Sequence, residues 1–523
     1  SATQRYALTS VPAGRLVVLD LFSDGSPAFD DYSGYAPQDA VFCAIPNFGG
    51  RSGLMGRLTN LANNYFLYKG KYPSSIKGIG AAPEAIEQTP VTYDLIFQLP
   101  WMGEKPDVAK WVENYATARY GAENEVVHEA WELLRQGPLN YGADGIQGPV
   151  EDVWAARPNL DANKASSWGK TLAQAQGTYT KARQQMLIDA TFKLLTQSES
   201  LGFTAGDGSV YESNYYYDLV EFGGAVLADY AYYLLLGIKE AKNASNTALY
   251  EERRDAFLQL ILDVDQFKGT NLNFRLGKWT QEARAAADEV KGATSATPDW
   301  YEYNNARTII STWSSPNTNL NDYSYRSWQG LMKDLYYPRW KHYFDNNCTS
   351  AEYGFFEWNW AHGRVHSVGQ TAVSDAYLTE GQTGHTSSYK REPEGNTIDV
   401  AKEVLGKYII PVVAGDGNYY AYRHLSNDMT AICTVVAERE ATIDLSSYFG
   451  ELTDVTITGD FIDGTATDIK NVTIKADATD GSHAGTITLS DGTELLFAVV
   501  INPAYNGVYK INYPNNGDIP VFL

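Results

Sequence analysis

The sequence predicts an α/β region, followed by an all-α region and a small β-sandwich, over its 523 residues. In residues 1–103, short apolar strands alternate with helical segments, a pattern typical of a parallel sheet. In residues 104–409, apolar residues recur at the three- and four-residue spacing of helices. In residues 410–523, short β-rich runs are mostly separated by Gly, Asp and Asn turns, which favours an antiparallel sandwich. We therefore expect three domains with these boundaries.

The α/β region contains three expected strands and two expected helices. The strands lie at 15–22, 40–45 and 75–80, and the helices lie at 53–66 and 89–99. The second helix has a clear start, because Thr89 suits an N-cap and Pro90 suits the first helical position. Glu84 therefore lies on the loop after the third strand, where α/β folds place catalytic groups. Most loop glutamates are only solvated, so this position alone assigns Glu84 no role.

The all-α region is expected to hold a series of amphipathic helices joined mostly by short polar links. These helices lie at 108–120, 126–134, 171–197, 217–242, 247–267, 279–289, 300–312 and 325–344. A turn at 204–209 is marked by its glycines and aspartate. A last helix is opened by residues 393–399 and ends near Tyr408.

The β-rich region is expected to begin beyond Pro411. Its runs lie at 419–425, 430–437, 442–445, 454–460, 471–475, 486–489 and 495–501. Their length and spacing suit a small antiparallel sandwich, but such a fold alone assigns no function.

Composition argues against two classes of partner. Asp and Glu number 63 against 41 Lys and Arg, which gives a formal net charge of -22 at pH 7. Such a charge disfavours binding to nucleic acid and to anionic membranes. No run approaches the ~20 apolar residues of a membrane span. The longest candidate, 228–238, is expected to be a core helix.

Neither a metal site nor a cofactor is expected. The cysteines Cys43, Cys348 and Cys433 suit no disulfide framework and form no CxxC pair. The 7 histidines show no paired metal-ligand spacing. Cys43 falls in a strand-to-turn segment, where it is either buried near a substrate or a small apolar residue of the core.

Aromatic residues are abundant, with 37 Tyr and 12 Trp. A ring face stacks on the apolar face of a pyranose while the phenol or indole donates a hydrogen bond, so carbohydrate is a suitable ligand. Most of these rings nevertheless suit the cores of a protein of this size.

A longer motif surrounds Glu84. Residues 78–93 read Gly-Ile-Gly-x-x-Pro-Glu-x-Ile-x-x-x-Pro-Val-x-Tyr, which resembles the nucleophile segment of the α-N-acetylglucosaminidases, glycoside hydrolase family 89. Four further segments resemble the same family, and they lie at 15–22, 42–50, 276–287 and 336–340. The likeness runs in order from about Val11 to Tyr408.

The resemblance implies a more specific fold. Residues 1–103 would be the C-terminal part of a (β/α)8 catalytic barrel, 104–409 an α-helical domain that completes the active site, and 410–523 a β-sandwich accessory domain. Three strands cannot close a barrel that needs eight. Either they form a small open sheet, or the barrel begins outside this sequence, and the resemblance favours the second reading. We expect the amino-terminal part to be missing or supplied by another polypeptide.

The resemblance also implies a reaction, the removal of terminal non-reducing α-linked N-acetylglucosamine by a retaining exo-glycosidase. Such an enzyme uses two carboxyl groups about 5–5.5 Å apart. The resemblance assigns the nucleophile to Glu84. It assigns the general acid/base to an Asn-Glu pair on an earlier barrel strand, and nothing in this sequence matches that pair. Asp20 is expected to serve only as a supporting hydrogen-bond partner.

Five residues are expected to bind substrate by the same resemblance. Phe42 stands where the family commonly has Trp, and Asn47 belongs to the turn that follows. Trp313 matches a pocket tryptophan of the family, and Leu320 and Tyr323 match the segment that lends an apolar contact and a tyrosine to the acetamido pocket. Without the resemblance, Trp313 would be read as a core residue.

Two features of the turn after Phe42 leave subsite details open. Gly49 and Gly50 either let the backbone approach the sugar or form a plain tight turn. Pro46 replaces a frequent His of the family, which removes a possible polar contact.

A second reading of the whole chain is a non-catalytic glycan-binding protein, or an inactive fragment, on the same scaffold. An upstream Asn-Glu segment in the full protein would distinguish the two. The β-sandwich has two readings of its own, support for the enzyme or glycan binding. The net charge of -22 makes a neutral glycan an easier substrate than a highly sulfated one. The compartments expected are those that hold such glycans: secreted, cell-envelope or periplasmic, or lysosomal.

Overall fold

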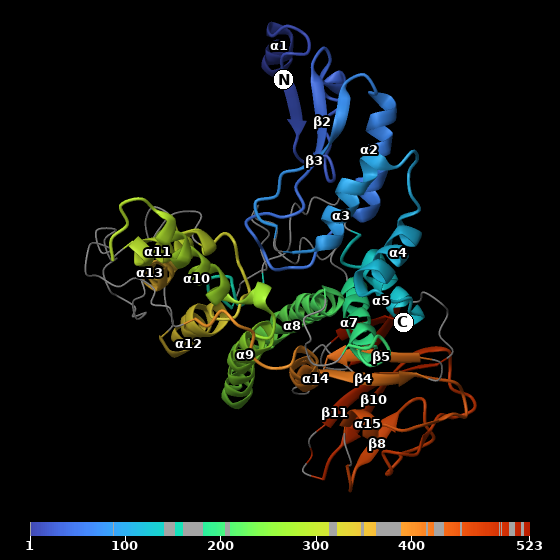
Figure 1. The fold of residues 1–523 in the computed structure, drawn as a ribbon. Coiled ribbons are helices and arrows are strands. Elements are labelled where there is room, and N and C mark those ends of the chain that lie inside the picture. The colour runs from blue at the N-terminus through green and yellow to red at the C-terminus, as the bar shows by residue number, and fades with distance from the viewer. Residues whose placement is uncertain are drawn as a thin grey trace.

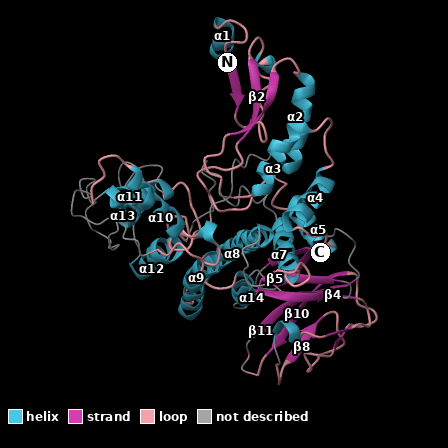
Figure 2. Ribbon diagram, viewed as in Figure 1, coloured by secondary structure: helices cyan, strands magenta, loops and turns pink. Residues whose placement is uncertain are grey.

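The computed structural model describes most of the chain. The described residues are 2–86, 88–140, 152–160, 181–203, 210–295, 297–312, 322–346, 350–361, 389–414, 417–422, 433–449, 452–490, 492, 494–501, 508–513 and 517–522. A small sheet with its helices lies at one end of the molecule, helices fill the middle, and a second group of strands lies at the other end (Figure 1). Figure 2 shows the strands confined to these two ends.

The first sheet is parallel, with strand order β1-β2-β3. Its strands are β1 (Val17–Asp20), β2 (Asp39–Ala44) and β3 (Ile76–Ala81). Helix α2 (Leu58–Lys71) lies between β2 and β3 along the chain, and α3 (Pro90–Gln98) follows β3. A short helix, α1 (Ala2–Ser10), precedes the sheet. The predicted α/β character of this region is confirmed, because parallel strands need such helical crossovers.

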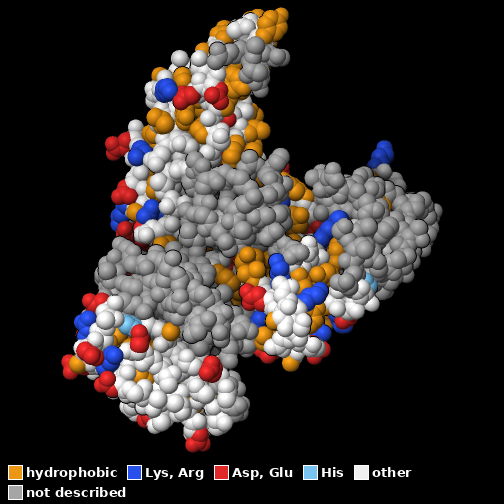
Figure 3. Space-filling model, turned by 180° about the vertical axis from the view of Figure 1, so that it is seen from behind, with side chains coloured by type: hydrophobic (Ala, Val, Ile, Leu, Met, Phe, Trp, Pro, Cys, Tyr) orange, Lys and Arg blue, Asp and Glu red, His pale blue; other side chains and the backbone are white. Residues whose placement is uncertain are grey.

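Strand β1 forms an edge of the described sheet and carries exposed apolar residues. Val17 and Leu19 are 54% and 55% exposed, whereas Asp20 between β1 and the next loop is buried. Tyr6 and Leu21 add to the apolar surface of this end of the molecule. Figure 3 shows apolar atoms over the same amino-terminal part.

The middle of the chain is helical, as its spacing predicts. Its helices are α4 (Val108–Tyr120), α5 (Glu125–Gln136), α7 (Lys181–Thr196), α8 (Val210–Asn243), α9 (Thr247–Lys268), α10 (Leu276–Ala286), α11 (Thr297–Ile309), α12 (Tyr337–Asn346), α13 (Ser350–Ala361) and α14 (Thr397–Tyr408). Of the helix expected at 171–197, the part before 181 lies outside the described residues.

Several helices differ from the prediction. Helix α2 lies five residues later than the expected 53–66, and α8 begins at Val210 rather than at 217. The helix expected at 325–344 begins only at Leu331, with a π-helical turn over Met332–Tyr336. Helix α13 was not predicted at all, although Tyr353, Phe356, Trp358 and Trp360 on it are buried. Apolar side chains lie almost all round α13, so it lacks the one-sided periodicity by which amphipathic helices are found.

Helix α8 is the central element of the helical region. It packs against α4, α7, α9 and α14. Its segment Ser213–Asn243 is long and apolar enough to cross a membrane, but 83% of its most apolar window is buried inside the protein. The prediction that 228–238 forms part of a core helix is confirmed. Figure 1 shows α8 running toward the junction with the first sheet.

The carboxyl-terminal strands have a core of their own. A four-stranded sheet has the order β6-β11-β10-β8. Its strands are β6 (Cys433–Ala437), β8 (Thr456–Gly459), β10 (Gly481–Thr488) and β11 (Glu494–Ile501). Three strand pairs accompany it: β4 (Ile409–Ala414) with β5 (Gly417–Tyr422), β7 (Thr442–Ile443) with β9 (Val472–Thr473), and β12 (Val508–Tyr513) with β13 (Gly517–Phe522).

The expectation of an antiparallel sandwich needs a correction. Strand β6 runs parallel to β11, whereas β11–β10 and β10–β8 are antiparallel, so the sheet is mixed. The described chain between β6 and β11 forms four other strands, β7 to β10, and the short helix α15 (Ser446–Phe449) before it returns. A connection of that length can bring a strand back in the same direction, and run lengths alone carry no information about it.

Candidate active site

The loop between β3 and α3 presents Glu84 to solvent. The side chain of Glu84 is exposed, whereas the neighbouring Gln88 and Thr89 are buried. The loop backbone is joined to the end of β2, since the N–H of Ala82 donates to the carbonyl of Ala44 at 2.8 Å. The N–H of Glu84 donates to the carbonyl of Asn47 at 3.1 Å. The carboxyl group of Glu84 is therefore carried on a backbone held beside the turn after β2.

Asn47 joins this loop to that turn. Its side chain is buried, and its Oδ1 accepts a hydrogen bond from the N–H of Gly50 at 2.7 Å. Its Nδ2 donates to the side-chain oxygen of Gln88 and, at 3.3 Å, to the carbonyl of Arg51. Gln88 in turn donates to the carbonyl of Gly50 at 3.3 Å. These bonds make Asn47 a structural link between the two loops, and its contact with a sugar stays a prediction.

Gly49 and Gly50 allow the turn to approach the helical region closely. Both have left-handed backbones, with φ values of +71° and +88°. A Cβ on Gly49 would lie 2.8 Å from the ring of Tyr323, and one on Gly50 would lie 2.4 Å from the guanidinium of Arg326. The two glycines therefore let the backbone of the turn approach protein side chains, Tyr323 and Arg326, and its approach to a sugar stays a prediction.

Substitution of Gly49 tests this close approach. Gly49→Ala should lower the free energy of unfolding by clearly more than Gly14→Ala, which has a similar φ of +73° but nothing within 4 Å of the new Cβ. Both variants bear a left-handed backbone cost of about 1–2 kcal/mol, and Gly49→Ala adds a clash of about 1–3 kcal/mol with Tyr323. Urea denaturation of the two variants measures the difference, and equal losses would contradict the packing described.

Tyr323 lies against the turn that carries Asn47. The guanidinium of Arg51 is 5.1 Å from the Tyr323 ring centroid and 5.0 Å from that of Tyr325. The Nε of Arg51 also donates to the carbonyl of Tyr323 at 3.4 Å. The structure thus brings the Glu84 loop, Asn47 and Tyr323 to one place, although Tyr323 follows Glu84 by more than two hundred residues.

The expected contact of Phe42 with substrate is not supported by the structure, because Phe42 is buried. Its side chain has no exposed surface, because it packs in the core between Phe29, at a centroid distance of 6.1 Å, and Tyr65, at 5.6 Å. A ring enclosed in this way offers no face to a sugar. The other two predicted pocket residues, Trp313 and Leu320, lie outside the described residues and stay predictions.

Asp20 makes local hydrogen bonds at the end of β1, and its supporting role at the site stays a prediction. Its carboxylate is buried at the end of β1 and accepts a hydrogen bond from the N–H of Ala28 at 2.8 Å. Burial raises the pKa of Asp20, while this bond and one from Tyr35 lower it. Burial, together with the charge of Asp20, also raises the pKa of the Cys43 thiol. Cys43 is therefore a buried thiol of the sheet.

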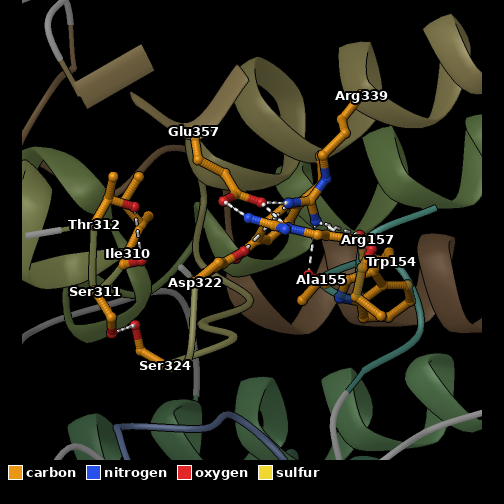
Figure 4. A network of polar contacts seen from close by, with 12 residues as sticks. Trp154, Ala155, Arg157, Ile310, Ser311, Thr312, Asp322, Ser324, Arg339 and Glu357 are labelled. Carbon is orange, nitrogen blue, oxygen red and sulfur yellow. Dashed lines mark hydrogen bonds and ion pairs between the residues drawn. The ribbon is translucent and has the colours of Figure 1, made fainter. Parts of the chain in front are cut away.

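A buried ion network holds the segment that carries Tyr323 (Figure 4). Arg339, Glu357 and Asp322 are each 0% or 1% exposed. Arg339 donates to Glu357 at 2.9 Å and lies 3.5 Å from Asp322, and Arg157 donates to the other oxygen of Glu357 at 2.9 Å. Arg339 also donates to the carbonyl of Ala155 at 2.7 Å. Burial raises the pKa of Asp322, and the charge of Arg339 opposes that rise.

Sequence reasoning missed this network. Arg339 lies in the Tyr-Tyr-Pro-Arg-Trp segment, which marked the family resemblance but suggested no partner. An arginine among aromatic residues in a helical pattern was the one available signal, because a buried arginine needs a carboxylate or carbonyl partner.

The chain is similar to known proteins over most of its length. A family model described as "Alpha-N-acetylglucosaminidase (NAGLU) C-terminal domain" matches residues 111–407. Another, "Alpha-N-acetylglucosaminidase (NAGLU) tim-barrel domain", matches residues 1–103, which supports the expected barrel segment. Human alpha-N-acetylglucosaminidase is 28% identical over 429 residues, which are 79% of this chain and 50% of the human protein. The chain thus spans about half the length of the curated relative it matches.

Solved structures from Clostridium perfringens have the same fold. A family 89 glycoside hydrolase in complex with PUGNAc matches with a TM-score of 0.61 and 25% identity, over 74% of this chain and 41% of that one. The enzyme in complex with its substrate GlcNAc-alpha-1,4-galactose matches with a TM-score of 0.63 and 24% identity, over 76% of this chain and 42% of that one. Since the first family model alone matches more than half of the residues, the chain belongs to the alpha-N-acetylglucosaminidase family, glycoside hydrolase family 89.

Proposed function

We propose that this chain forms part of a retaining exo-glycosidase that removes terminal non-reducing α-linked N-acetylglucosamine, with Glu84 as the nucleophile. The observation that supports this best is the contrast within one loop. The Glu84 side chain is exposed, while the backbone around it is tied to the turn after β2 and to buried Gln88. A carboxylate that must attack a bound sugar needs both access and a fixed position.

The reaction needs a second carboxyl group. Glu84 would attack the anomeric carbon and form a glycosyl-enzyme bond as the leaving oxygen takes a proton from the general acid. The same group, then acting as base, would remove a proton from the water that breaks this bond. We place this acid/base outside the present sequence, because the sheet described has three strands and no segment matches the family's Asn-Glu pair.

The helical region would complete the site. Tyr323 reaches the Gly49–Gly50 turn from a segment in the middle of the helical region, so it would line a pocket beside the Glu84 loop. The relatives carry the same two regions, and one bacterial relative is described with GlcNAc-alpha-1,4-galactose as its substrate. We propose a neutral glycan with terminal α-GlcNAc as substrate, in a secreted, periplasmic or lysosomal setting.

Hydrolysis of an aryl α-GlcNAc glycoside tests the function. The protein is assayed together with the barrel segment that supplies the acid/base, and NMR follows the anomer of GlcNAc released first. The α-anomer is expected, with no cleavage of the β-linked glycoside. Release of the β-anomer would exclude the retaining mechanism. Binding of the glycoside without turnover would favour the non-catalytic glycan-binding reading.

A further inference from the structure

Thr89, at the carboxyl end of the Glu84 loop, has an unusual backbone. It occupies the N-cap position of α3 with φ +50° and ψ +58°, in the left-handed region. A β-branched residue rarely adopts this conformation, which costs about 1–2 kcal/mol. The predicted side-chain cap is absent here, since the Thr89 side chain makes no capping bond to the helix. Something other than local preference must hold Thr89.

Glu221 of helix α8 makes the contact that Thr89 needs. The Thr89 N–H donates to Oε1 of Glu221 at 2.6 Å, across 132 residues of sequence. Both residues are buried, with exposures of 7% and 2%. Hydrogen bonds from a backbone N–H to a carboxylate are among the stronger ones in proteins. This bond ties the loop to the central helix of the helical region.

The surroundings of Glu221 disfavour its ionised form. Burial, and after it the charge of Asp218, raise its pKa, while the Thr89 N–H, Lys268 and Arg119 lower it, and the pKa that results is about 7. Tyr115 lies within reach of its charge. Its Oε2 has no hydrogen-bond partner among the described residues. A leucine of similar size would avoid these costs, so the carboxylate serves a purpose other than packing.

The other ties of the loop come from the barrel side. Asn47 holds the backbone of Glu84 and the side chain of Gln88, and Tyr93 of α3 donates to the carbonyl of Ala85 at 3.1 Å. Each of these partners belongs to the sheet end or to α3. The hydrogen bond between Thr89 and Glu221 instead joins the loop to the helical region.

We propose that Glu221 is a positioning residue, which fixes the carboxyl end of the Glu84 loop by holding the Thr89 N–H. The inference rests on the proposed nucleophilic role of Glu84. Glu221 touches no reacting atom, but it sets the backbone from which Glu84 reaches the sugar. A misplacement of about 1 Å at a nucleophile can cost roughly 100-fold in rate.

Three substitutions separate the hydrogen bond from the charge and the volume. Glu221→Gln keeps an acceptor at the same reach, and its kcat should stay within about threefold of the parent. Glu221→Leu removes the acceptor, and Glu221→Asp keeps the charge but withdraws it by one methylene. Both should lower kcat by about 10- to 100-fold, with a smaller change in KM.

Rescue at Thr89 provides the sharpest test. Glycine adopts φ +50° without strain, so Thr89→Gly in the Glu221→Leu background should recover most of the lost kcat. Glu302→Leu is the matched control, because Glu302 is also fully buried, has its pKa raised to about 7 by burial, and lies on α11. It should lose stability without the same fall in kcat.

The outcomes separate this inference from the proposed function. If the parent hydrolyses the α-glycoside and Glu84→Gln does not, but Glu221→Leu and Glu221→Asp keep the parental kcat, the positioning role is overturned. Equal losses in Glu221→Gln and Glu221→Leu, or no rescue by Thr89→Gly, would also overturn it. An inactive parent would instead overturn the proposed function, and the inference with it.

Stability against pH gives a readout that is independent of turnover. The folded-state pKa of Glu221, about 7, lies above the ordinary value of 4.5, so ionisation destabilises the fold as pH rises through 7. Glu221→Gln should therefore melt at the same temperature as the parent at pH 4.5 and at a higher one at pH 8. Equal melting temperatures at pH 8 would contradict the buried, unneutralised position described for this carboxyl group.

Discussion

We expect Glu84→Gln to abolish hydrolysis of α-GlcNAc glycosides, with kcat lowered by at least about 10⁴-fold. The amide has the shape of the carboxylate but no negative charge, so it cannot form the glycosyl-enzyme bond. Loss of a nucleophile typically costs this much or more. Substrate binding should change little, because the exposed Glu84 side chain is replaced by one of equal size. Steady-state kinetics and glycoside binding, measured on the same preparations, report the two effects.

Two further variants test whether this loss is specific to Glu84. Glu104→Gln changes another exposed glutamate, twenty residues after Glu84, and should leave kcat unchanged. Glu84→Ala with an activated aryl α-glycoside and azide should yield the β-glycosyl azide. Azide then attacks the anomeric carbon from the face that the carboxylate has vacated, and the aryl oxide leaves. Turnover that survives Glu84→Gln, or azide that gives no β-product, would remove Glu84 from the nucleophile role.

Arg339→Met lowers the free energy of unfolding by about 3–5 kcal/mol, the largest stability effect we expect. The substitution leaves Glu357, which is fully buried, with Arg157 as its remaining ionic partner, and it removes the positive charge 3.5 Å from buried Asp322. It also frees the carbonyl of Ala155 from a 2.7 Å hydrogen bond. Most of this loss comes from two buried carboxylates that share less positive charge, since Asp322 loses its ion pair and Glu357 keeps only Arg157.

Denaturation in urea, followed by circular dichroism, measures this effect. Lys341→Met is the matched control, since Lys341 lies on the same helix and pairs with Asp345 at the surface. Exposed pairs contribute little, so it should be nearly silent. The double variant Arg339→Met with Glu357→Leu should lose less than the sum of the single losses, because each partner is costly mainly when left alone. A strictly additive double variant would contradict the coupling described.

Arg339→Met should also change the structure of the candidate site. Asp322 is adjacent to Tyr323, and Asp322 has a left-handed backbone with φ +52°. Once the network is broken, the contact between Tyr323 and the Gly49 turn loses its support. The ion network is thus a stability element whose position also determines where Tyr323 lies.

Local patterns were sufficient for most elements. Helix α4 was predicted at 108–120 and is found at Val108–Tyr120, because it carries its own boundaries. Asp107 caps its first N–H groups, and Gly121 ends it with φ +71°. Helix α13 was missed because it is apolar on nearly every side, and the direction of β6 was missed because pairing depends on a distant strand.

In the candidate site, too, some positions follow from local sequence and others from packing. The motif at 78–93 identified Glu84 from sequence, because the strand, loop and helix that present it are contiguous. The position of Phe42 could not be foreseen in that way. Alternation along a strand separates its two faces, but it does not tell which face meets the core and which meets a ligand.

Glu84 on its loop, the βα alternation and the run of helices follow from residues close together in the chain, where propensity and spacing act. The bond between Thr89 and Glu221, the network of Asp322, Arg339 and Glu357, and the approach of Tyr323 to Gly49 follow from how whole elements pack. The residues in each of these contacts are separated along the chain by other elements, so no local sequence pattern predicts the contacts. Burial then decides the chemistry, because the same carboxyl group is solvated at Glu84 and desolvated at Glu221.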